Sequence, residues 1–312
     1  MPFRWHGVCL DIPEEWNPGK IIGDPKSGNV RLDDAEMIRV EVEWKSADGD
    51  SRIEPIVDRY IEGLAKTAQK EKHALNVERG TDTLDLSQIP FDNVTYFRWR
   101  SSFDVHTLAC HSPLSDRHLF VRVMSKPDED DTELLQRLFA SLTDTAPDSA
   151  QRWSLFGLQV TSPAGYQLDE YDLKSGHIRL QFSSGKSILQ VDRLSLANAL
   201  LREVSLEDWY AGFFVKDLRY VNYTVEEDPQ FGDQSIWIRG EPKSRSQSLL
   251  QPLPFWDARP RRSFTARVWE DRPENRIIAL QSWWKSEAEA PDVETISKSV
   301  NPTVSELNPA AS

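Results

Sequence analysis

A seven-residue stretch occurs twice in this chain of 312 residues, and it constrains the fold more than any other feature of the sequence. Residues 26–32 read Lys-Ser-Gly-Asn-Val-Arg-Leu, and residues 174–180 read Lys-Ser-Gly-His-Ile-Arg-Leu. Five of the seven positions are identical, and one of the two differences exchanges valine for isoleucine. Pro13 and Pro163 fall at matching places ahead of the stretch. The sequence therefore predicts two copies of one structural unit.

The length of the chain suits two domains of about 150 residues each. Between the halves, residues 143–150 read Thr-Asp-Thr-Ala-Pro-Asp-Ser-Ala, a polar composition typical of a linker. We therefore expect a first repeat at 1–145 and a second repeat at 152–301. The last residues, 302–312, are expected to form a disordered tail.

Hydrophobic periodicity predicts the same order of elements in both halves. In the first half, strands are expected near residues 7–12, 30–32, 38–44, 93–100, 103–111 and 118–124, and helices near 54–73 and 134–142. In the second half, strands are expected near 156–160, 187–194, 220–225, 235–239, 264–269 and 277–284, and helices near 205–216 and 292–300.

One strand of the first half has a regular alternation. Ile38, Val40 and Val42 are two residues apart, so an unbroken strand would place them on one face. The apolar stripe of the helix that follows carries Ile61 and Leu64. We expect the strand and the helix to share one hydrophobic core.

The order of elements also resembles a known fold. A strand that begins at Gly7 and closes on the Pro-x-x-Trp of residues 13–16 is followed by a second hairpin, a helix, three long strands and a Leu-rich helix. This order resembles the PsbP-type fold, which is named for a photosystem II extrinsic protein and is shared with the Ran-binding nuclear import factor and with chaperones of type VI secretion effectors. The resemblance implies an α+β fold class, with two tandem copies of an antiparallel sheet packed with helices. It also implies a non-enzymatic binding module, and it carries no functional motif over to this chain.

The clearest cluster of potential metal ligands lies in one predicted hairpin. His106, Cys110, His111 and His118 occur within 13 residues. Neighbouring residues of a strand point to opposite faces, so Cys110 and His111 do not readily share an ion, and His106 with Cys110 gives only two ligands. The sequence therefore predicts no metal site and no thiol nucleophile. The two cysteines, Cys9 and Cys110, are expected to be free thiols, and a disulfide would require their strands to be neighbours.

Two further stretches resemble anion-binding sites. Residues 184–187 read Ser-Gly-Lys-Ser, but a phosphate-binding loop needs glycine five residues before Gly185, where the chain has Leu180. Arg31 and Arg179 follow the repeated Lys-Ser-Gly, which is better explained as turn chemistry than as a duplicated anion site. We predict no cofactor and no catalytic residue.

Charge and hydropathy exclude two classes of partner. The net charge is −13, and an acidic chain gives no general reason to bind nucleic acid. No apolar run approaches the roughly 18 residues that a membrane span needs, and the N-terminus lacks the apolar core of a signal peptide. We expect a cytoplasmic protein without a membrane span.

The second half departs from the first between Arg239 and Phe264, where the first half has only a tight turn. Arginine and tryptophan often dominate the binding energy of interfaces, and this insertion is rich in both basic and large apolar residues. The candidate partner-binding residues are Phe255, Trp256, Arg259, Arg261 and Arg262. The alternative is that the insertion folds back and caps its own domain or the other repeat.

Two functions therefore remain open at this stage. The leading hypothesis is a non-enzymatic protein-interaction module, an adaptor, chaperone or assembly subunit with a protein partner that the sequence does not identify. The alternative is a small-molecule or lipid-binding protein with a cleft between the repeats or lined by tryptophan. An apolar cavity with a few converging polar groups would favour the ligand binder, and an exposed apolar patch would favour the adaptor.

Overall fold

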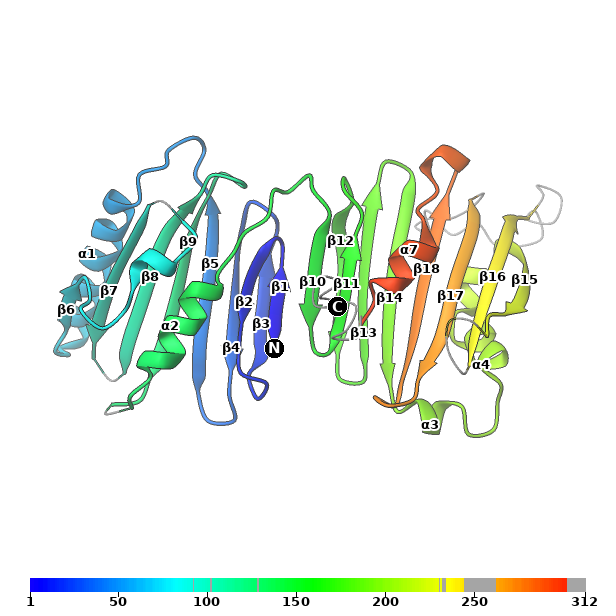
Figure 1. Cartoon of the computed structure of the whole chain (residues 1–312), viewed down its shortest axis with the longest axis horizontal. Helices are drawn as coiled ribbons and strands as arrows, with labels where there is room; N and C mark the ends of the chain where they lie inside the picture. Colours follow the sequence, from blue (N-terminus) through cyan, green and yellow to red (C-terminus); the bar gives the residue numbers. More distant parts are fainter. Residues whose placement is uncertain are drawn as a thin grey trace, which may run out of the picture. The chain divides into compact units, whose positions relative to one another are not determined.

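The computed structural model describes residues 1–91, 93–101, 103–127, 129–229, 231, 234–243 and 262–301. The chain divides into two compact units, Met1–Gly157 and Leu158–Ser312. Each unit contains one seven-stranded antiparallel sheet, whose strands run side by side in Figure 1.

The sheet of the first unit has the strand order β3-β4-β5-β9-β8-β7-β6. The elements of this unit are β1 (Pro2–Trp5), β2 (Val8–Asp11), β3 (Asn17–Gly23), β4 (Ser27–Asp33), β5 (Ile38–Ser46), α1 (Glu54–Glu71), β6 (Asn76–Arg79), η1 (Leu86–Gln88), β7 (Val94–Arg100), β8 (Asp104–Ser112), β9 (Arg117–Ser125), α2 (Thr132–Ser141) and β10 (Gln151–Leu155). The short strand β10 belongs to this unit, and its Ser154 pairs with Arg4 of β1.

The sheet of the second unit has the order β12-β13-β14-β18-β17-β16-β15, which repeats that of the first strand for strand. The elements of this unit are β11 (Leu158–Ser162), β12 (Gln167–Lys174), β13 (His177–Ser184), β14 (Ser187–Ser195), α3 (Ala197–Leu200), α4 (Leu206–Phe213), α5 (Val215–Leu218), β15 (Val221–Glu227), β16 (Ser235–Pro242), β17 (Ser263–Asp271), β18 (Arg276–Trp284), η2 (Glu287–Glu289) and α7 (Val293–Lys298).

The fold class expected from the sequence, an α+β domain of the PsbP type, is wrong, because the described residues form mainly β-structure. The helix expected over 205–216 is interrupted at Phe214, so that only the two turns of α4 and the single turn of α5 remain. In the first unit the β1–β2 hairpin also packs against the sheet, since the ring of His6 in its turn lies 6.0 Å from the ring of Trp44 in β5.

The two helices of the first unit lie on opposite faces of its sheet (Figure 1). On β7, Phe97 packs in one cluster with Ile53 and Val57 at the start of α1. The preceding residue, Tyr96, has its ring 6.3 Å from that of Phe139 in α2. Adjacent strand residues point to opposite faces, so α1 and α2 cover different sides.

The expectation that Val40 and Val42 share a core with α1 is also wrong. Val42 pairs with Val121, the neighbour of Phe120, and it is Phe120 that belongs to the α1 cluster. A bulge explains the error: Leu32 pairs with Val40, but the next residue of β4 pairs with Ile38, so one residue is skipped. The bulge turns Ile38 toward α1 and leaves both valines on the opposite face.

Both units fasten the C-terminal end of their last helix to an early strand in the same way. In the first unit the Ser141 hydroxyl accepts from the Asp11 N–H at 2.9 Å. In the second unit the Ser299 hydroxyl accepts from the Thr161 N–H at 3.1 Å. The repetition therefore extends from strand order to individual hydrogen bonds.

Candidate ligand-binding cavity

A cavity of about 540 Å³ lies between α1 and the sheet of the first unit. Its lining is mostly apolar and comes from α1, from four neighbouring strands and from the segments beside them. The lining residues are Met37, Ile38, Glu41, Tyr60, Leu64, Trp99, Phe103, Val105, Arg122 and Met124. A volume of this size is in the ordinary range for small-molecule sites, which is about 300–1,000 Å³.

Strand register builds the floor of this cavity. Trp99 of β7 pairs with Val105 of β8, and Val105 pairs with Met124 of β9, so the three side chains form one row across the sheet. The roof comes from α1, where Tyr60 and Leu64 are four residues apart and therefore lie on the same side of the helix. The cavity thus depends on contacts between elements that are far apart in sequence.

The polar end of the cavity is a charged cluster around Arg122. The Arg122 Nε donates to Glu41 Oε2 at 3.2 Å, and its Nη2 donates to Glu43 Oε2 at 2.9 Å. Its guanidinium carbon lies 5.6 Å from the centroid of the Tyr60 ring, a cation–π geometry. These contacts with Glu41, Glu43 and Tyr60 hold the Arg122 side chain in place at the edge of the cavity.

Burial and neighbouring charges shift the pKa values of this cluster. Burial raises the pKa of the Tyr60 hydroxyl, and the positive charge of Arg122 offsets part of that rise. Burial alone would lower the pKa of Arg122, but Tyr60 and the two glutamates outweigh it and raise that pKa above its ordinary value. Arg122 is therefore a permanent cation at neutral pH.

Trp99 contributes its ring to the wall of the cavity. Its indole Nε1 is buried and has no hydrogen-bond partner among the described residues. A buried donor left unpaired costs about 1–3 kcal/mol of stability.

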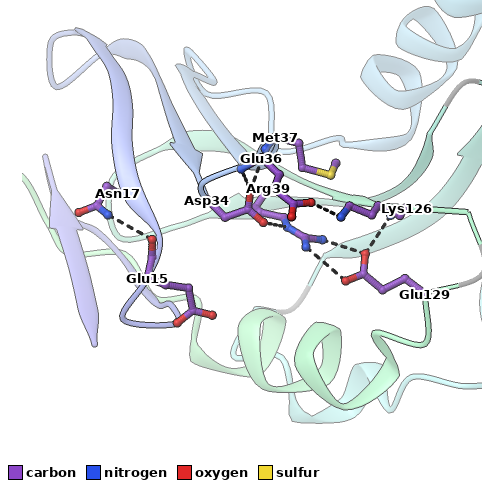
Figure 2. Close-up of polar contacts among 8 residues, drawn as sticks. All are labelled: Glu15, Asn17, Asp34, Glu36, Met37, Arg39, Lys126 and Glu129. Carbon is purple, nitrogen blue, oxygen red and sulfur yellow. Dashed lines mark hydrogen bonds and ion pairs between the residues drawn. The ribbon is translucent and has the colours of Figure 1, made fainter.

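An ion network next to the cavity holds the β4–β5 turn, which carries Met37 (Figure 2). Arg39 donates to Asp34 at 2.5 Å and to Glu129 at 2.9 Å, and Lys126 pairs with Glu36. Burial would raise the pKa of Asp34, but hydrogen bonds from Arg39 and from two backbone N–H groups lower it to about 2. The network fixes the loop and leaves Met37 free to line the cavity.

Of the candidate partner-binding residues of the sequence, Arg262 is among the residues that the structure describes. Phe255, Trp256, Arg259 and Arg261 fall outside the described residues. Arg262 is half-buried directly before β17, in the second unit.

The strands bring two members of the histidine and cysteine cluster together, since the rings of His111 and His118 lie 5.6 Å apart, but each of the other members has different surroundings. The Tyr96 hydroxyl lies 2.6 Å from His106 Nδ1, and His111 Nε2 lies 3.3 Å from a carboxylate oxygen of Asp116. Burial raises the pKa of the Cys110 thiol far above its ordinary value, which suppresses the nucleophilic thiolate. Among the described residues, His, Cys, Asp and Glu form no group of three or more that could hold a metal ion.

The two arginines of the repeated stretch bind carboxylates of their own unit. Arg31 donates to Asp33 at 2.9 Å, and Arg179 donates to Asp192 at 2.6 Å. These intramolecular ion pairs favour the structural interpretation over a duplicated anion site.

The Ser-Gly-Lys-Ser stretch is a hairpin turn. Ser184 pairs with Ser187 across it, and Gly185 has a positive φ of 56°. The turn borders a cavity of about 710 Å³ in the second unit. Two of its polar residues already serve the fold, since Ser187 accepts from Tyr166 and Asp292 caps α7. This second cavity is therefore the weaker candidate.

Sequence reasoning missed Glu41, Tyr60, Trp99 and Arg122. One signal was available, because Arg122 is a charged residue inside an otherwise apolar predicted strand. A charged residue at such a position needs a partner, but the sequence does not say that the partner comes from β5, about 80 residues earlier.

No protein-family model matches the chain, and no curated protein matches its sequence. Among the described residues, no helix is both long and apolar enough to cross a membrane.

Proposed function

We propose that this chain is a non-enzymatic binding protein whose first unit holds a small amphipathic molecule in the cavity under α1. The supporting observation is the combination of an apolar row, Trp99–Val105–Met124, with one charged cluster at Glu41 and Arg122. Such a lining accommodates an apolar tail and orients one polar head. A location in the cytoplasm is part of the proposal and is checked by cell fractionation.

A cavity-filling variant tests this function. Leu64→Trp places a larger side chain into the cavity, whereas Ala65→Trp adds the same group at an exposed position of the same helix. Calorimetric titration with 1-octanol should detect binding to the wild type and to the Ala65→Trp control. Binding to Leu64→Trp should be at least tenfold weaker. Equal affinity in all three proteins would contradict the proposal.

A protein partner is the second candidate function, and the composition of residues 239–267 favours it. Seven basic residues and two acidic residues lie in this stretch of an acidic chain, together with the aromatic pair Phe255 and Trp256. Basic and aromatic side chains of this kind often anchor interfaces with acidic proteins.

Replacement of residues 244–260 by a short Gly-Ser turn tests this second candidate. A binding arm predicts unchanged melting and loss of a partner that the wild type recovers from cell extract. The paired change Phe255→Ala and Trp256→Ala should reproduce the loss. A lowered melting temperature with unchanged recovery would instead identify the segment as a cap.

A further inference from the structure

The charged cluster of Glu41, Glu43 and Arg122 carries more negative than positive charge, and Glu41 and Arg122 are its members that line the first-unit cavity. Two carboxylates, from Glu41 and Glu43, face the single guanidinium of Arg122. Exposure sharpens this imbalance, because the Glu41 side chain is 31% exposed and the Arg122 side chain only 10%. A head group that enters the cavity therefore meets a carboxylate more readily than the guanidinium.

The aromatic lining also favours a positively charged head group. Trp99 and Phe103 contribute rings to the cavity in addition to Tyr60, whose ring already packs against the Arg122 guanidinium. Aromatic faces attract ammonium and guanidinium groups by about 0.5–2 kcal/mol, and they offer nothing comparable to an anion.

An anionic head group would meet two obstacles. The guanidinium of Arg122 already donates to two carboxylates, so a third one would have to displace a partner. The wider field is also unfavourable, because residues 1–150 contain 18 basic and 28 acidic side chains, a balance of −10.

We infer that the ligand of this cavity is an amphipathic amine, with a singly charged ammonium head next to Glu41 and an apolar tail along Trp99, Val105 and Met124. This inference rests on the proposed function and adds the charge class of the ligand. Glu41 Oε2 is used by Arg122, and Oε1 is the oxygen to which the ammonium would lie closest.

Three probes with the same tail test the charge class: octyltrimethylammonium, 1-octanol and octanoate, titrated calorimetrically at pH 7.5 and low salt. We expect the ammonium to bind at least tenfold more tightly than octanoate, with 1-octanol between them. The preference should shrink as the salt concentration rises.

Substitution of the carboxylate gives the second arm of the experiment. Glu41→Gln should weaken the binding of the ammonium at least fivefold more than the binding of 1-octanol, because only the ammonium loses a counter-charge, and circular dichroism reports whether the fold is intact. The matched control is Glu62→Gln, an exposed position of α1 with the same change in net charge.

The outcomes separate the two proposals. If 1-octanol binds but the ammonium has no advantage over octanoate, or if both variants weaken the ammonium equally, the charge class is wrong and the cavity function stands. If none of the three probes binds to the wild type, both proposals fail.

Discussion

At the scale of single residues, the repeated stretch uses one glycine for two different purposes. A Cβ at Gly28 would lie 2.1 Å from the Trp44 ring, so this position needs glycine because the ring approaches its backbone. Gly176 has open space around it but a φ of 83°, so glycine is needed there for the turn. Identical sequence therefore does not imply identical local structure.

The burial of one residue, His6, makes the folding stability depend on pH. It is enclosed by the rings of Trp5, Trp153 and Trp44. Burial, together with the positive charge of Arg117, lowers its pKa from 6.5 to about 4. Because the folded pKa is the lower one, the unfolded chain takes up a proton first as pH falls. Stability should therefore be lost between pH 6.5 and about 4.

We predict that His6→Asn reduces this acid sensitivity. Asparagine tolerates the positive φ of 48° at this position but does not titrate. Between pH 7 and pH 5, the variant should lose about 2 kcal/mol less free energy of unfolding than the wild type, as one proton of linkage allows. Urea unfolding at each pH measures this difference. His73→Asn, at an exposed site, is the control, and equal pH dependence of His6→Asn and the wild type would refute the prediction.

At the scale of elements, a single bulge decides what β5 packs against. It separates Ile38, which lines the cavity with Leu64, from Val40, which is fully buried on the opposite face. The bounds of α1 agree with the hydrophobic period of the sequence, because the helix spans Glu54–Glu71 and was expected over 54–73. The bounds of α1 thus follow from local pattern, while the face that β5 packs follows from register.

A double-mutant cycle tests the face assigned to Val40. Val40→Ala and Val123→Ala change directly paired residues, so their effects on stability should be coupled by about 0.5 kcal/mol or more. Val40→Ala and Leu64→Ala change opposite faces, so their effects should add within about 0.5 kcal/mol. If urea unfolding shows the reverse pattern, the assignment is wrong and Val40 shares a core with α1.

At the scale of the whole molecule, the two units keep one strand order but differ at a matched acidic position. Register places Glu41 opposite Arg31 and Asp192 opposite Arg179. The Asp192 side chain is fully buried and accepts hydrogen bonds from His177, Arg179, Gln190 and Gln281. Glu41 is partly exposed and borders a cavity. One copy therefore uses its carboxylate for stability, and the other leaves it accessible.

This difference predicts that substitutions at the two matched positions lower the free energy of unfolding by different amounts. Asp192→Asn should destabilise the protein by about 2–3 kcal/mol, because it removes the charge of a fully buried carboxylate that accepts four hydrogen bonds, one of them from Arg179. Glu41→Gln should cost less than about 1 kcal/mol, since the pair is partly exposed and Arg122 keeps Glu43. Thermal unfolding of both variants gives the comparison, and a larger cost at Glu41 would contradict the assignment.

The sequence by itself determined the local elements, because each depends on residues within a few positions of one another. The alternation of β5 from Val40 onward, the period of α1 and the Ser205 cap of α4 were all readable in this way. Only the tertiary structure decided which face Val40 buries, that Glu41 meets Arg122, and that Trp99, Val105 and Met124 form one row. Those outcomes depend on strand register and on a bulge between distant segments, and periodicity within one strand carries no information about its neighbours.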